Sequence, residues 1–241
     1  MIRCEIQKSR PKSFPHVSLT QRGSAAVSDL SGVSERDAAF GLTLETTPHY
    51  YGCGRRGRAG AEPGVVLQLV VGDERFNIEA RRGKTDELFI SLRETFGRAP
   101  IKPMRTVEAG GFEFISIGPS RWHAISRGPD RDERHALLRE AIHDLATMVE
   151  IAHGFIVFRL TGPMVTEVLI KHVRVDLDPE VFSPGACVTT ELHGMTVQLR
   201  RTCDGDAYEC AVARSYGGSL FHALTCAADP YGLLVLPAGD V

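Results

Sequence analysis

The chain becomes regular at Val65-Val-Leu-Gln-Leu-Val-Val-Gly-Asp-Glu-Arg-Phe-Asn-Ile-Glu-Ala80, a stretch that carries two predicted strands. Residues 65–71 are almost entirely apolar and predict the first strand. Gly72-Asp73 predicts a tight turn, and residues 76–80 predict the second strand. We therefore expect a β-hairpin to open the folded part of the chain.

The same arrangement returns further along the sequence. Strands are predicted over 148–152 and 155–160, with His153-Gly154 as the turn between them. Other turn glycines also recur at a nearly constant offset, which is typical of an internal duplication. Three pairs of glycines lie 82, 83 and 87 residues apart: Gly72 with Gly154, Gly111 with Gly194, and Gly118 with Gly205.

The duplication predicts an α+β fold of two ferredoxin-like ββαβββα halves. The halves span 65–146 and 147–228, with an extended arm over 1–64 before them and a tail over 229–241 after them. Further strands are predicted over 105–109, 112–117, 122–126, 187–192, 196–200 and 208–212. Helices are predicted over 85–96, 131–145, 163–171 and 215–227. We expect the helices of each half to cover one face of an antiparallel sheet.

The N-terminal arm, residues 1–64, shows no sustained periodicity. It contains four prolines and a cluster rich in glycine and arginine over 52–60, and both features disfavour helices and strands. Segments that bury little apolar surface of their own fold mainly against a partner. Two alternatives stay open: the arm is disordered by itself, or it becomes ordered along another subunit.

Composition excludes two classes of partner. The chain has 28 basic and 30 acidic residues and a formal net charge of −2, so no overall field attracts nucleic acid or an anionic membrane. Its longest apolar runs, such as 65–71 and 233–236, are far shorter than the roughly 20 residues of a membrane span. The beginning, Met1-Ile-Arg-Cys-Glu-Ile-Gln-Lys8, lacks the apolar core of a secretion signal. We therefore expect a soluble cytoplasmic protein with free thiols.

No arrangement of residues in the sequence predicts catalysis or a metal site. Gly52-Cys-Gly-Arg-Arg-Gly57 has the letters of a dinucleotide-binding loop, but it lacks the buried strand before it and the helix after it. The six cysteines lack the close spacing of zinc or redox pairs. His153 and His193 each precede a turn glycine, which turn chemistry explains. Trp122 is either a core residue or an aromatic contact for a partner.

The second half contains several distinctive segments, namely Val149–Gly154, Phe158–Pro163, Val168–Lys171, Val175–Pro179, Phe182–Gly185 and Arg214–Phe221. These segments resemble the gamma subunit family of heterotetrameric sarcosine oxidases. Gly118–Trp122 is similar to a strand in the family's first half. The resemblance covers about residues 65–228. It departs from the family at His123, where an apolar residue is usual, and in the long segment 1–64.

The resemblance implies a fold related to the glycine-cleavage aminomethyltransferase and its folate-binding relatives. It also implies a non-catalytic gamma subunit that assembles with larger alpha and beta flavoprotein subunits and a small delta subunit. Such complexes oxidatively demethylate sarcosine to glycine, yielding formaldehyde or methylene-tetrahydrofolate and hydrogen peroxide. FAD, FMN, NAD and tetrahydrofolate are then bound by the partner subunits and none by this chain.

Two other functions stay open from the sequence. One is the small subunit of a dehydrogenase for N-methylglutamate or another methylated amine. The other is a stand-alone folate-binding protein similar to aminomethyltransferases, in which Arg159 and Glu191 would hold the ligand. No catalytic residue is expected in this chain. As candidate subunit-interface residues we select Trp122, Arg159, Arg214 and Tyr216, because aromatic and arginine side chains are enriched at interfaces.

Overall fold

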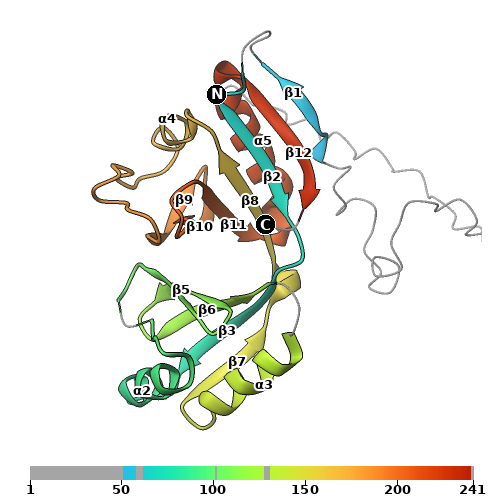
Figure 1. The fold of residues 1–241 in the computed structure, drawn as a ribbon. Helices are drawn as coiled ribbons and strands as arrows, with labels where there is room; N and C mark the ends of the chain where they lie inside the picture. Colours follow the sequence, from blue (N-terminus) through green and yellow to red (C-terminus); the bar gives the residue numbers. More distant parts are fainter. Residues whose placement is uncertain (1–50, 58–61, 101, 128–130, 240–241) are drawn as a thin grey trace, which may run out of the picture. The chain divides into compact units, whose positions relative to one another are not determined.

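The computed structural model describes residues 51–57, 62–100, 102–127 and 131–239, which form two β-sheets with helices (Figure 1). The strands are β1 (Gly54–Arg56), β2 (Val65–Val70), β3 (Glu74–Ala80), β4 (Thr106–Ala109), β5 (Phe112–Gly118), β6 (Arg121–Ser126), β7 (Ala146–Glu150), β8 (Phe155–Thr161), β9 (Cys187–Leu192), β10 (Met195–Arg201), β11 (Tyr208–Ala213) and β12 (Leu233–Gly239). The α-helices are α2 (Thr85–Phe96), α3 (Arg131–Ala141), α4 (Val165–Leu169) and α5 (Gly217–Ala228). Short 3-10 helices are η3 (Ala152–Gly154), η4 (Arg214–Tyr216) and η5 (Asp229–Tyr231). The predicted α+β class is confirmed.

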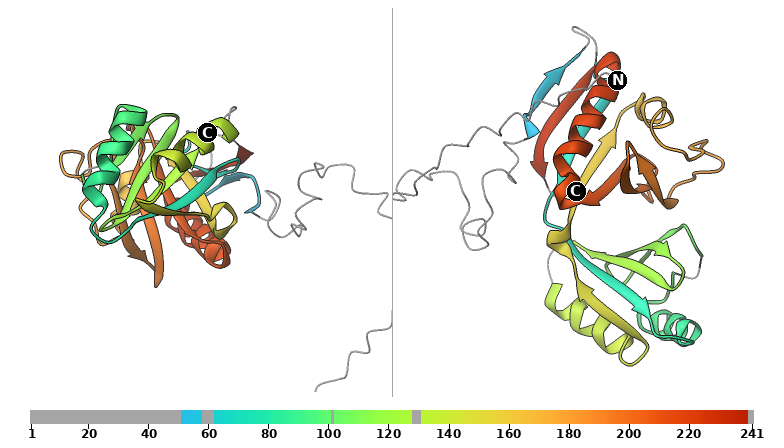
Figure 2. Two further views of the ribbon diagram at one scale, coloured as in Figure 1. Left: turned by 90° about the horizontal axis from the view of Figure 1, so that it is seen from below. Right: turned by 180° about the vertical axis from the view of Figure 1, so that it is seen from behind.

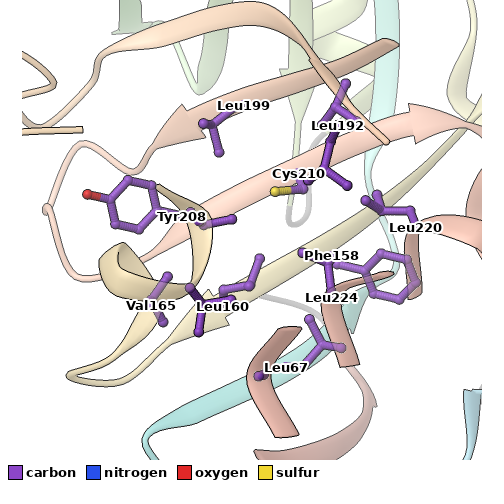
Figure 3. Packing of buried hydrophobic residues seen from close by; sticks show 14 of the residues in the cluster. Leu67, Phe158, Leu160, Val165, Leu192, Leu199, Tyr208, Cys210, Leu220 and Leu224 are labelled. Atoms are coloured by element: carbon purple, nitrogen blue, oxygen red, sulfur yellow. The ribbon is translucent and has the colours of Figure 1, made fainter. Parts of the chain in front are cut away.

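The larger sheet has seven strands in the order β1-β12-β2-β8-β11-β10-β9. All its strand pairs are antiparallel except β12 with β2, which is parallel. Helix α5 lies across one face of this sheet (Figure 2). Because side chains alternate along a strand, every second residue points to that face. Figure 3 shows the resulting core, in which Leu67, Phe158 and Leu160 of the sheet pack with Leu220 and Leu224 of α5.

The smaller sheet has five strands in the order β4-β5-β6-β3-β7, and all its pairs are antiparallel. Helices α2 and α3 share one core with one face of this sheet. Its buried residues include Phe76, Ile78, Phe112, Phe114, Trp122 and Ala124 from the strands and Leu88, Leu92, Leu138 and Ala141 from the helices. Each sheet therefore has one face covered by helices, as the sequence predicts.

The internal duplication is present, but it starts one strand later than predicted. From β3 to β7 and again from β8 to β12, the chain forms a strand, a helix, three strands, a helix and a strand. The strand orders also correspond, since β4-β5-β6-β3 in one sheet matches β9-β10-β11-β8 in the other. The structural repeats thus cover 74–150 and 155–239, whereas the predicted halves were 65–146 and 147–228. Strand β2 is an addition, inserted between β8 and β12.

The two predicted hairpins at the start of each half are wrong. β2 pairs with β8 and β12 in the larger sheet, whereas β3 pairs with β6 and β7 in the smaller one. Gly72, with φ of 82°, lies where the chain crosses between the sheets. At His153-Gly154 the chain crosses back, from β7 in the smaller sheet to β8 in the larger. Turn residues in a sequence indicate where the backbone changes direction. They do not indicate which strand pairs with the strand that follows the turn.

The two ends of the described chain also belong to the larger sheet. The predicted tail contains η5 and β12, and Leu233 and Val235 of β12 are only 1% and 4% exposed. From the predicted arm, β1 pairs with β12, and Tyr51 is buried with its ring centre 5.2 Å from that of Phe158. The remainder of the predicted arm, residues 1–50 and 58–61, lies outside the described residues.

Candidate functional site

The face of the larger sheet opposite α5 carries a row of polar side chains. The strand register places Arg200 on β10 beside Glu209 on β11, and Glu209 beside Arg159 on β8. Arg159 in turn lies beside Gln68 on β2. These positions alternate with the apolar residues that face α5, so they share the other face. Oppositely charged neighbours across strands stabilise a sheet, but here the row also meets the second sheet.

The smaller sheet brings its own charged residues to this row. They lie on β3, β5 and β6 and beside the ends of β3 and β6, on the side of the sheet not covered by α2 and α3. We refer to the combined set as the ionic junction: Asp73, Arg75, Glu113, His123, Arg127, Arg159, Gln198, Arg200 and Glu209.

Arg200 and Glu209 form the centre of the ionic junction, and they are 3% and 2% exposed. Arg200 Nη2 donates hydrogen bonds to Glu209 Oε2 at 2.6 Å and to Glu113 Oε2 at 2.9 Å, so it joins the two sheets. Burial by itself lowers the pKa of Arg200, but Glu209 and Glu113 outweigh burial and raise that pKa above its ordinary value. Arg200 is therefore a permanent buried cation.

Arg127 makes a second link between the sheets. Its Nη1 donates to Glu113 Oε2 at 2.9 Å, its Nε donates to Asp73, and its Nη2 lies 3.6 Å from Glu209 Oε2. Burial tends to raise the pKa of Glu113, but Arg200 and Arg127 lower it below its ordinary value. Glu113 is thus a shared counterion for two arginines, one from each sheet.

Arg75 and His123 extend the ionic junction, and they are 2% and 3% exposed. Arg75 Nη1 lies 3.5 Å from both His123 Nδ1 and Gln198 Oε1. Because a guanidinium only donates, His123 Nδ1 must accept. Burial lowers the pKa of Arg75 to about 10. Burial and, next, the charge of Arg75 lower the pKa of His123 to about 3, so this histidine is neutral in the fold.

The buried neutral state of His123 predicts a stability that falls in acid. In the unfolded chain a histidine titrates near pH 6.5, whereas the folded value for His123 is about 3. Between these values the unfolded state binds more protons, so stability falls as the pH drops, by about 1.4 kcal/mol per pH unit. We expect His123→Gln to reduce the slope of the unfolding free energy against pH below about pH 6.5, measured by urea titration.

The matched control for this experiment is His143→Gln, since the side chain of His143 is 79% exposed. It should leave the slope unchanged. A His123→Gln variant with the wild-type slope would show that His123 is not held neutral by the fold.

An apolar cluster and close packing complete the contact between the sheets. Ile115 and Ile125 of the smaller sheet are buried together with Cys187 of the larger sheet. Beside them, a cavity of about 10 Å³ is lined in part by Arg75, Arg200 and Glu209. This is about the space that one water molecule needs, so no organic substrate fits there. The ionic junction is built to hold two sheets together.

Among the described cysteines, Cys53 and Cys226 are exposed, whereas Cys187, Cys203 and Cys210 are buried or partly buried. Burial raises the pKa values of Cys187, Cys203 and Cys210, to about 11 for Cys203 and about 12 for Cys210, so these thiols stay protonated and unreactive. Across 51–57, 62–100, 102–127 and 131–239, no three His, Cys, Asp or Glu side chains lie close enough together to hold a metal ion. Among the helices in these ranges, none has both the length and the apolar character that crossing a bilayer requires.

A groove of about 790 Å³ lies elsewhere on the larger sheet's half of the chain. It is bordered by α5, by the turn between β9 and β10, and by the segments that follow α4 and α5. Polar and aromatic side chains line it, and we call it the histidine groove after Lys171, His172, His193, Tyr216, His222 and Tyr231.

The turn between β9 and β10 holds one side of the histidine groove. Leu192 pairs with Met195, so His193-Gly194 is a two-residue hairpin loop, as predicted. Both residues have positive φ, 48° and 79°, which is the geometry of a type I′ turn. This turn places His193 Nε2 at 3.0 Å from His172 Nδ1.

Comparison of the sequence with protein families decides what kind of chain this is. A sequence model described as sarcosine oxidase, gamma subunit family, matches residues 99–229, more than half of the chain. The chain belongs to the sarcosine oxidase gamma subunit family. The matched range includes Glu113, Arg200 and Glu209 of the ionic junction and most of the histidine groove. No curated protein matches the sequence.

Solved structures share the fold of this gamma subunit family member. A chain of the heterotetrameric sarcosine oxidase from Corynebacterium sp. U-96, in complex with pyrrole 2-carboxylate, has a TM-score of 0.61 and 22% identity, with 76% of this chain and 90% of that chain covered. The glycine cleavage system aminomethyltransferase T from Bartonella henselae has a TM-score of 0.54 and 11% identity, with 79% of this chain and 50% of that chain covered. This chain thus spans about half the length of the transferase. The predicted likeness to the aminomethyltransferase fold is confirmed.

Of the four candidate interface residues of this gamma subunit family chain, Trp122 is buried and Arg159 is partly buried. Trp122 is 4% exposed and packs edge-on against Phe89 with ring centres 5.5 Å apart, so it is a core residue and presents no surface to a partner. Arg159 belongs to the ionic junction, where its guanidinium lies 3.8 Å from carboxylate oxygens of Glu209 and Asp204. Its role within the chain is to pair with these acids.

The other two candidates lie together on η4. Arg214 is half-buried, and its Nε donates to the backbone carbonyl of His153 at 2.9 Å, which fixes η4 to the crossing between the sheets. Tyr216 is 50% exposed and lines the histidine groove. Of the four, Tyr216 is the one with a large exposed side chain at a concave surface.

The sequence interpretation missed the ionic junction. Glu209 sits between the apolar residues Tyr208 and Cys210, and Arg200 follows Leu199 in an alternating strand, a pattern that is typical of a solvent-facing position. The smaller sheet covers that face. The predicted hairpins gave no reason to expect a second sheet there. The available signal was one charged residue within each of the predicted strands 155–160, 196–200 and 208–212, namely Arg159, Arg200 and Glu209, which the structure brings side by side.

Proposed function

We propose that this chain is the non-catalytic gamma subunit of a cytoplasmic heterotetrameric complex of the sarcosine oxidase type. The observation that carries the proposal is membership of the gamma subunit family over residues 99–229. The fold supports it, since this chain covers 90% of a chain from a heterotetrameric sarcosine oxidase. Its function in the complex is to bind and hold larger subunits.

The pairing of the charged residues in the ionic junction supports a structural role for this chain. In the ionic junction, arginines and carboxylates from both sheets are paired with one another in a space too small for a substrate. The buried thiols stay protonated. A rigid, internally paired body of this kind is suited to presenting a fixed surface to partner chains.

In the proposed complex the chemistry takes place on other chains. Alpha and beta flavoprotein subunits and a small delta subunit would bind FAD, FMN, NAD and tetrahydrofolate. There, two electrons and two protons would pass from the N-methyl C–N unit of sarcosine to oxygen, giving hydrogen peroxide and an imine. Water would hydrolyse the imine to glycine and formaldehyde, or tetrahydrofolate would take up the methyl carbon in place of water and release glycine. If the partners instead form a dehydrogenase, N-methylglutamate or another methylated amine takes the place of sarcosine.

The proposal is tested by purifying this chain together with its partners and measuring the enzyme activity of the purified material. The tagged full-length protein is recovered from its native host at low salt, and the eluate is assayed for oxidation of sarcosine and of N-methylglutamate. We expect turnover of one of these amines by the eluate and none by the chain purified alone. An eluate that turns over neither would contradict the proposal.

A folate-binding function for the isolated chain has less support. Arg159 lies on β8 and Glu191 on β9, and two strands, β11 and β10, separate them in the sheet. Arg159 is paired with Glu209 and Asp204, and Glu191 is exposed. Tetrahydrofolate binding by the isolated chain would nevertheless assign it this second function, so the same preparation should be titrated with that ligand.

A further inference from the structure

The described titratable side chains that line the histidine groove include basic residues and no acidic ones. Lys171 and three histidines line it, and no aspartate or glutamate is among the described residues of its lining. Lys171 Nζ donates to the Tyr231 hydroxyl and lies 4.9 Å from the centre of that ring. The hydrogen bond to Tyr231 raises the pKa of Lys171, so the ammonium stays charged. The groove therefore attracts negative charge.

The two facing histidines add positive charge when a partner supplies a counterion. Burial lowers the pKa of His172, and the nearby His193 and Lys171 lower it further. Protonation of His172 is thus held back in the free chain. A carboxylate beside the pair would favour the protonated form, and its attraction would then be strengthened by one or two further positive charges.

Apolar and aromatic surface lies alongside this charge. Tyr216 is 50% exposed in the groove, and Met195 lies in the groove wall. Exposed aromatic side chains at a concave surface are typical of the central part of an interface. A groove of about 790 Å³ is large enough to receive several side chains of a partner segment.

We propose that the histidine groove binds an acidic segment of a larger subunit of the complex, with carboxylates at Lys171 and His193 and an aliphatic or aromatic side chain against Tyr216. This inference rests on the proposed function and adds the docking surface and the chemistry of the partner segment. Complementary charge between the groove and the segment sets the partner's position and speeds association. The ionic junction, which shares no residue with the groove, plays no part in docking.

Binding of an acidic segment to the histidine groove is coupled to the uptake of protons by the groove. The charged or titratable groups near His172 are His193, Lys171, His222, Cys226 and Tyr231, with Glu167 close to Lys171. Because an acidic segment raises the pKa of His172 on binding, affinity is strongest below the pKa of His172 in the free chain and weakens as the pH rises through its pKa in the bound state. Retention of the partner should therefore be greater at about pH 6 than at about pH 8.

The test uses the full-length tagged chain in its native complex, with partner retention measured against salt concentration at both pH values. Lys171→Glu places a negative charge in the groove and should reduce the affinity for the partner at least about tenfold. His193→Asn removes an imidazole, yet it creates the Asn-Gly pair that type I′ turns favour, so the hairpin is kept. We expect this variant to lose much of the pH dependence. The matched control is Arg93→Glu, an exposed position on α2.

Each outcome decides between the two proposals. Equal thermal unfolding of Lys171→Glu and wild type, together with weaker retention that Arg93→Glu does not share, supports docking at the histidine groove. Wild-type retention by Lys171→Glu, or an equal loss in Arg93→Glu, overturns the groove proposal and leaves the gamma subunit function intact. If the wild-type chain retains no partner at all, both proposals fail.

Discussion

Replacing Glu209 by glutamine is expected to lower the free energy of unfolding by about 3–5 kcal/mol, a large share of the roughly 5–15 kcal/mol that stabilises a typical domain. Glu209 accepts hydrogen bonds from Arg200, lies 3.6 Å from Arg127, and lies 3.8 Å from Arg159. The neutral amide leaves these three guanidinium groups with too little compensating charge. Because the groups are largely buried, water compensates for this only in part.

Urea unfolding of the variant and of Glu191→Gln gives the comparison. Glu191 lies on β9 of the same sheet but is exposed, so its replacement should change stability by less than about 0.5 kcal/mol. Combining Glu209→Gln with Arg200→Gln should recover part of the loss, since the second change removes the unpaired cation. A loss below about 1 kcal/mol in Glu209→Gln would mean that the ionic junction does not hold the sheets together.

Ending the chain after Gly232 is expected to abolish cooperative folding. The truncation removes β12, which pairs with β1 on one side and β2 on the other. It takes Leu233 and Val235 out of the core, each contributing about 1.5–3 kcal/mol through burial. It also exposes the edge of β2 and leaves β1 without a partner strand. The summed loss is comparable with the whole stability of a domain of this size.

Circular dichroism during a thermal ramp measures this effect. The control chain ends after Gly239, so it keeps all of β12 and should unfold with the wild-type transition. A chain ending after Gly232 that still unfolds in one sharp transition at the wild-type temperature would show that β12 is dispensable.

Element types could be predicted from the sequence because each strand and helix has its own local pattern. In β10, for example, Met195, Val197 and Leu199 alternate with polar residues and are all buried. Helix α2 starts at the predicted Thr85 and ends at the predicted Phe96. The repeated order of elements was also readable, since the turn glycines that mark it recur at a steady offset.

Strand partners could not be predicted because they depend on contacts between distant residues. The segment around Gly72 has the composition of a hairpin turn, yet the chain passes there from one sheet to the other. That error concealed what covers the polar face of the larger sheet, and therefore the burial of Arg200 and Glu209. The apolar run at the start of β12 gives no sign of its role, because nothing in the local sequence indicates that β2 needs a parallel neighbour.

The candidate site was only partly accessible to sequence reasoning. Tyr216 was selected because aromatic residues are common at interfaces, and it does line a groove. The histidines of that groove come from three separate segments, around His172, His193 and His222, so no sequence motif predicts that they lie together. The same reasoning selects Trp122, but Trp122 packs against Phe89 in the core of the smaller sheet.

The proposed function makes this chain one subunit among larger flavin-bearing ones. Sedimentation of the tagged chain, gently purified from its native host, tests it most directly when the chain and flavin absorbance are followed together. We expect the chain to sediment in one boundary with flavin, at a mass several times its own 26.3 kDa. A colourless chain that sediments alone under these conditions would contradict it.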